Sequence, residues 1–230
     1  ARPMLNFGVF RHPMFSLASA ITMILNMAMF SGILLLPIYM QTVIGFSPLH
    51  SGLTLLPGAI LNAALSPVNG RLFDRYGARV LAVTGLVITA VTTFLFSRLT
   101  LETGTVWLMA VHALRMAGFS MVMMPVSTNG LNQLPPALYP HGTAMNNTLN
   151  QVSGAIGTAV LMSVMEIRQA AHARELAAEA AAGAGGADIA VRAMLGGIND
   201  TFFASGMLLV LGLVLAFFVR RARPAGGPRP

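Results

Sequence analysis

Cysteine is absent from the chain, and charged residues make up only 9% of it. Without cysteine there is no disulfide framework, no zinc–thiolate site and no cysteine nucleophile. Soluble domains usually carry about 25% charged residues. With 55% hydrophobic residues and a mean hydropathy of +0.72, the composition excludes an ordinary soluble domain and predicts an all-α membrane protein.

Acidic and metal-binding chemistry is equally scarce. Only seven residues are Asp or Glu, and we expect none in the central part of a membrane span. The five histidines are scattered without the spacing of metal ligands. No glycine-rich phosphate loop with a lysine, no paired carboxylates and no serine nucleophile elbow are visible. We therefore predict that the protein is not an enzyme and holds neither a metal nor a cofactor.

The net charge of +7 does not indicate a nucleic-acid partner. The arginines are not clustered on a polar domain but stand at the edges of apolar segments, which is the positive-inside pattern of membrane proteins. The lipid bilayer is thus the first expected partner.

Six segments are apolar over roughly the 20 residues that cross hydrocarbon. They cover about 15–40, 53–69, 80–96, 105–126, 143–165 and 201–219. The arginines before the first span, between the second and third, and in the tail 220–230 predict that both termini are cytoplasmic. Residues 166–200 then form an extracellular or periplasmic loop, which we interpret as a solvated spacer: 168–182 is rich in Ala and Glu and extends the fifth helix, and the glycine-rich segment 183–186 ends it in a flexible linker.

The fourth span contains Arg115 near its middle, and an arginine in hydrocarbon must turn toward the bundle interior or a wet cavity. At 100° per residue, Arg115 shares one face with His112, Met116, Phe119 and Met123. Two alternatives remain open. This face lines a ligand cavity, or Arg115 holds backbone carbonyls in place while the methionines fill gaps.

The fifth span has the most pronounced polar face, because its amides and glycines lie on one side of the helix. We predict that Gly154 and Gly157 allow close helix packing. For Asn146 and Asn150, cavity lining and hydrogen bonding between helices both remain open. The other predicted cavity residues are Asn26 and Phe30 in the first span and Asn62 in the second.

Between the second and third spans, three arginines and one aspartate occur within the ten residues Gly70–Arg79. These charges must lie at a membrane surface, and Gly70 and Gly77 predict a tight turn between neighbouring helices. Asp74 has two possible roles, capping a helix N-terminus or pairing with Arg75 or Arg79. Alternatively, the motif only sets the orientation of the protein.

This motif resembles the cytoplasmic signature loop of the major facilitator superfamily. Other segments are similar, in the same order, to the fourteen-span drug:proton antiporters: 35–41, 45–48, 51–58, Arg115 with Gly118 and Pro125, and 141–157. The resemblance is to multidrug and lincomycin-type efflux permeases of bacterial inner (plasma) membranes.

In that family the spans divide into six, two and six, and this chain resembles the last six. The resemblance implies a carboxy-terminal half-bundle, a missing amino-terminal bundle as its partner, a hydrophobic or amphipathic substrate and a proton gradient as energy source. It also assigns Asp74 and Arg75 to a cytoplasmic conformational latch. The start at Ala1, without an initiator Met, agrees with a piece of a longer polypeptide. The alternative is a free-standing six-span binding or assembly module without transport activity.

Overall fold

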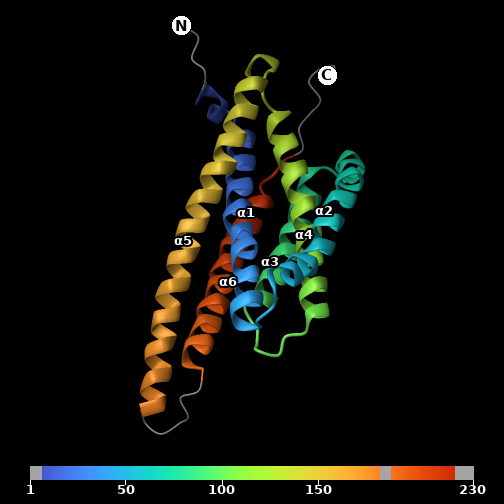
Figure 1. Ribbon diagram of the computed structural model, residues 1–230. Coiled ribbons are helices and arrows are strands. Elements are labelled where there is room, and N and C mark those ends of the chain that lie inside the picture. The colour runs from blue at the N-terminus through green and yellow to red at the C-terminus, as the bar shows by residue number, and fades with distance from the viewer. Residues whose placement is uncertain (1–6, 182–187, 221–230) are drawn as a thin grey trace.

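The computed structural model describes residues 7–181 and 188–220, and within these ranges the chain is helical without a β-strand. The α-helices are α1 (Pro13–Ile38), α2 (Pro48–Tyr76), α3 (Ala78–Phe96), α4 (Thr105–Leu131), α5 (Tyr139–Ala181) and α6 (Ile189–Ala216). Short helical turns η1 (Phe7–Arg11), η2 (Tyr39–Val43) and η3 (Pro136–Leu138) flank them. Figure 1 shows one bundle of roughly parallel and antiparallel helices, as the sequence predicted.

Helix boundaries follow local chemistry. Pro13 begins α1, and Ser47 caps α2 by accepting a hydrogen bond from the backbone N–H of His50 (3.2 Å). Helices α2 and α3 are separated by Gly77 alone, whose φ of 82° suits a residue without a Cβ.

The predicted loop 70–79 needs correction. Helix α2 continues to Tyr76, so Gly70 lies inside a helix and not at a turn. Gly77, not Asp74, occupies the N-cap position of α3. The physical reason is that a helix makes its backbone hydrogen bonds internally, in water as well as in lipid. Charged residues can therefore continue α2 beyond its apolar segment instead of ending it.

The first part of the predicted loop 166–200 continues the fifth helix, as the sequence predicted, whereas its second part needs correction because it belongs to the sixth helix. Helix α5 runs to Ala181 and α6 already begins at Ile189, so the sixth helix starts about three turns before the predicted span. The two helices pack here because Gly197 lies against the backbone of Met165, and Gly196 against the ring of His172. The glycine-rich linker predicted at 183–186 and the tail 221–230 lie outside the described residues.

Five helices among the described residues are long and apolar enough to cross a membrane: α1 with η2, α2, α3, α4 and α6. Helix α5 is not among them, because amides interrupt its apolar sequence. Its 43 residues span about 65 Å, so it is long enough to cross hydrocarbon and extend beyond it. The fifth span therefore remains a prediction from the sequence.

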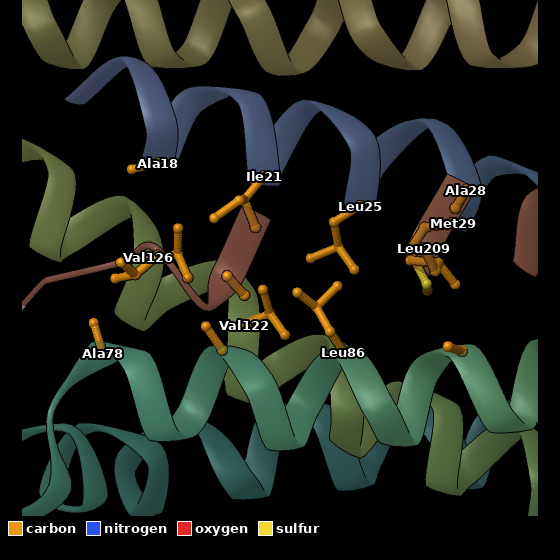
Figure 2. Packing of buried hydrophobic residues seen from close by; sticks show 14 residues of the cluster. Ala18, Ile21, Leu25, Ala28, Met29, Ala78, Leu86, Val122, Val126 and Leu209 are labelled. Atoms are coloured by element: carbon orange, nitrogen blue, oxygen red, sulfur yellow. The ribbon is translucent and has the colours of Figure 1, made fainter. Parts of the chain in front are cut away.

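The main apolar cluster joins α1, α3, α4 and α6. Figure 2 shows Ile21 and Leu25 of α1 pointing toward Leu86 of α3 and Val122 of α4. Helix α2 contributes no buried residue to this cluster, although its Phe73 packs against it. It is the most exposed of the candidate spans: 17% of its most apolar 18 residues are buried, against 39–56% in the others. A large face of α2 is therefore free of contact with the rest of the described chain.

Candidate functional site

An open groove of about 340 Å³ lies between α2, α4 and α5. Its lining consists of Asn62, Ser66, Phe119, Ser120, Met123, Met124, Ser127, Thr128, Leu131, Asn146, Asn147 and Asn150. Amides, hydroxyls, thioethers and one aromatic ring make up this wall, and it contains no charged side chain. Four sequence-predicted cavity residues from three helices are thus brought together: Asn62, Phe119, Asn146 and Asn150.

Several polar groups of the groove have no hydrogen-bond partner among the described residues. The side-chain amides of Asn62, Asn146 and Asn147 make no hydrogen bond to any described residue. The hydroxyl of Ser127 is buried and also lacks a hydrogen-bond partner in the described part of the chain. Since amides and hydroxyls in an apolar setting favour hydrogen bonding, this wall is prepared to bind polar groups of a ligand or water.

Asn150 differs from these amides because it is already engaged. Its Oδ1 accepts a hydrogen bond from the Asn26 amide (2.9 Å), which links α5 to α1. The Asn26 amide also reaches the sulfur of Met123 at 4.0 Å. Asn26 is not part of the groove lining, so the structure places it behind the wall, where it fixes Asn150 and the spacing of two helices.

The close approach of α5 to α1 depends on glycines. A Cβ on Gly154 would lie 2.5 Å from the ring of Phe30, and one on Gly157 would lie 2.6 Å from the Met27 Cα. Both glycines are buried. Phe30 therefore packs into the helix contact and is not one of the residues that line the groove.

Arg115 is not at the groove. Its side chain is fully buried, at 0% exposure, between α1, α3, α4 and α6. Nε donates a hydrogen bond to the Thr93 hydroxyl (3.1 Å), and Nη2 donates to the Ala28 carbonyl (3.0 Å) and the Ser31 hydroxyl (3.3 Å). This geometry fits the alternative in which Arg115 holds backbone carbonyls in place, because its guanidinium binds the Ala28 carbonyl.

His112 is likewise buried, with 6% exposure, and its ring lies against Gly58 of α2. The predicted common face of α4 is therefore divided: His112 and Arg115 face neighbouring helices, while Phe119 and Met123 line the groove. Helical periodicity gave the direction of each side chain around α4 but not the helix that covers it.

A smaller cavity of about 330 Å³ lies at the arginine-rich end, between α2 and α4. Gly70, Phe73 and Asp74 line one side, and Pro125, Thr128 and Asn132 the other. In the same motif, the Arg75 guanidinium lies 5.3 Å from the centre of the Tyr76 ring. The loop-motif residues are thus placed at one end of the bundle, and their role as a latch stays a prediction.

A further polar cluster was missed by the sequence reasoning. Asp200 of α6 accepts hydrogen bonds from Arg168 (2.5 Å) and from the ring of His172 (2.9 Å), both on α5. The charge and hydrogen bond of Asp200 raise the pKa of the Arg168 guanidinium above its ordinary value. The spacing of Arg168 and His172 at i and i+4 was a usable signal, because it places both on one face of α5. No group able to hold a metal ion occurs among the described residues.

Comparison with known proteins gives a consistent result. Residues 2–158 match the Major Facilitator Superfamily. The chain is 42% identical over 224 residues to "Lincomycin resistance protein LmrB" of Bacillus subtilis, covering 96% of this chain and 45% of that protein. It is 41% identical over 222 residues to the protein of the same name in Listeria monocytogenes, with 96% and 46% coverage. Identity to "Multidrug export protein EmrB" of Escherichia coli is 26% over 179 residues, with 76% and 34% coverage. The chain spans about half the length of the two lincomycin resistance proteins and a third of the last.

Proposed function

Because the chain belongs to the Major Facilitator Superfamily, a family of multi-pass membrane transporters, we propose that it forms one six-helix half of a drug efflux permease. The substrate is a hydrophobic or amphipathic small molecule, and its export is driven by the entry of protons. In this proposal the chain is the carboxy-terminal half, and an amino-terminal bundle of the same polypeptide completes the transporter.

The observation that carries the proposal is the uncharged groove. Unpartnered amides from α2 and α5 and thioethers from α4 face the same space, and α2 leaves most of its surface uncovered. Such a wall binds hydroxyl, amide and apolar groups together, whereas a site for a strongly charged substrate needs an opposite charge. Closed by a second bundle, the groove becomes a cavity near the middle of the membrane.

Proton coupling is assigned mainly to the other half of the polypeptide. The described helices bring no carboxylate to the groove. Asp200 binds Arg168 and His172 where α5 meets α6, and it does not line the groove. Arg115 has no carboxylate partner among the described residues: its Nε and Nη2 donate to two hydroxyls and a carbonyl, and its buried Nη1 has no hydrogen-bond partner there. This half therefore supplies the ligand wall, and its partner supplies the proton carrier.

We also propose a location in the bacterial inner membrane with both ends of this chain cytoplasmic. The start of α1, the α2–α3 turn and the end of α6 lie at one end of the bundle (Figure 1). Arginines are concentrated in that turn and around Arg220, in agreement with the positive-inside pattern.

The test uses the full-length polypeptide in sealed vesicles with an imposed pH gradient and lincomycin as the transported compound. We expect gradient-dependent transport and a KM raised about tenfold or more in a variant carrying Asn62→Leu and Asn146→Leu, since two hydrogen-bonding groups of the wall are lost. Gln41→Leu is the matched control, because Gln41 is an exposed amide outside the groove.

Three results would separate the parts of the proposal. Transport without gradient dependence contradicts antiport. An unchanged KM in the double variant contradicts the groove. No transport of lincomycin or of other amphipathic drugs favours the stand-alone binding module.

A further inference from the structure

A second groove, of about 430 Å³, lies where α3 begins and α6 ends. Five residues line it: Arg79, Val80, Val83, Thr84 and Phe217. The two helices meet behind it, because Ala78 of α3 and Ala216 of α6 belong to the same buried cluster. The groove is thus an outward-facing furrow between two packed helices, separate from the groove between α2, α4 and α5.

The walls of this furrow are apolar. Val80 and Phe217 are each about half exposed, at 50% and 51%. The hydroxyl of Thr84 donates a hydrogen bond to the Val80 carbonyl, so it is turned to its own backbone and is satisfied. Because five helices of this multi-pass protein are apolar enough to cross a membrane, exposed apolar side chains of α3 and α6 are covered by lipid.

Arg79 gives the furrow one charged end. It is exposed in the first turn of α3 and makes no hydrogen bond or ion pair to any described residue. The motif around it carries three arginines and one aspartate, so this end of the protein is positive. A guanidinium at the end of an apolar furrow matches a ligand with an anionic head and a hydrocarbon tail.

We propose that this furrow binds one anionic phospholipid of the surrounding leaflet. Its phosphate pairs with Arg79, and one acyl chain lies along Val80, Val83 and Phe217. Charge complementarity favours this occupant over the carboxyl-terminal residues 221–230, since these carry three arginines and no acidic residue. The proposal depends on the location of the chain in a membrane and not on drug efflux.

The test measures lipid retention by the purified full-length protein, using native mass spectrometry after exchange into micelles doped with phosphatidylglycerol or phosphatidylcholine. We expect preferential retention of phosphatidylglycerol and a loss of about fivefold in Arg79→Gln, the factor that one arginine contributes near an anionic surface. Arg71→Gln is the matched control, because Arg71 is exposed on α2 in the same motif but outside the furrow.

Two more variants keep the result interpretable if Arg79→Gln unfolds. Arg79→Lys retains the charge and should retain most of the phosphatidylglycerol, while Val83→Trp fills the furrow and should lower retention without changing charge. Equal losses in Arg79→Gln and Arg71→Gln would overturn the proposal in favour of diffuse surface charge. Equal retention of the two lipids would also overturn it. Higher retention after deletion of 221–230 would show that the tail occupies the furrow instead.

Discussion

Arg115 shows how a membrane-buried charge is accommodated without a carboxylate. Three donor–acceptor contacts spread its charge over a carbonyl and two hydroxyls, and the face of Phe202 lies 6.0 Å from the guanidinium. The space it needs is provided by Gly32 of α1. A Cβ on that glycine would stand only 1.6 Å from Nη1 of Arg115.

The first prediction follows from this contact. Gly32→Ala should displace the guanidinium from its acceptors and destabilise the protein by about 3–5 kcal/mol, since overpacking and the loss of buried hydrogen bonds act together. Thermal unfolding followed by circular dichroism should show a clearly lower Tm. Gly52→Ala is the control, because Gly52 lies in α2 with open space around it and should change Tm little.

A double-variant cycle tests the mechanism of that loss. If Gly32→Ala acts by displacing Arg115, then Gly32→Ala combined with Arg115→Ala should cost much less than the sum of the two single changes. Strictly additive changes in Tm, or an unchanged Tm in Gly32→Ala, would contradict the assignment of Arg115 as an internal brace.

At the scale of helices, the groove depends on how closely α5 approaches α1. The Asn26–Asn150 hydrogen bond and the glycines of α5 act at the same crossing. If the two helices separated, Asn150 would lose its partner and the amides of α5 would change their position relative to α2 and α4. The crossing is therefore a determinant of groove shape, although its residues lie mostly behind the wall.

The second prediction concerns this crossing. Gly157→Leu should lower stability by about 1–3 kcal/mol and lower the transport rate, because its side chain meets the backbone of Met27. Ala155→Leu, on the exposed face of the same helix, is the control and should leave both unchanged. Thermal unfolding and vesicle transport measure the two effects, and equal behaviour of the two variants would contradict the close crossing.

The third prediction concerns the cluster that ties α5 to α6. Asp200→Asn removes the charge that Arg168 and His172 share, so segment 168–180 should exchange its amide hydrogens about two- to fivefold faster, a modest effect because the pair is partly exposed to solvent. Glu179→Gln is an exposed control on the same helix. Unchanged exchange in Asp200→Asn would show that packing alone holds the extension.

The helices themselves were predictable because hydrocarbon demands long apolar segments with few charges. Their ends were not, because α2 and α6 remain helical through Arg71–Tyr76 and Ile189–Asp200, where charged residues or glycines mark a boundary in the sequence that the helices do not follow. The groove amides Asn62 and Asn146 were predicted because each lies on the polar face of its helix. The inward orientation of Arg115 was also predicted, but the choice between a cavity and an internal brace was not, nor was the packing of Phe30 against α5, because one helix's periodicity does not identify its neighbours.

At the scale of the whole molecule, the bundle is closed on one side and open on the other. Helices α1, α3, α4 and α6 share a packed core, whereas α2 and the amide face of α5 border an uncharged groove. This asymmetry agrees with the proposed role as one half of a transporter, in which the packed side is a rigid body and the polar wall is turned to a second bundle.

The most direct test of this arrangement is the reactivity of single cysteines in an otherwise cysteine-free full-length protein. Asn146→Cys lies in the groove, and Val160→Cys lies on the exposed apolar face of the same helix. A water-soluble maleimide should label Asn146→Cys, the transported drug should slow that labelling, and Val160→Cys should resist it. Equal labelling at both positions, or no effect of the drug at Asn146→Cys, would contradict a water-filled substrate groove between α2, α4 and α5.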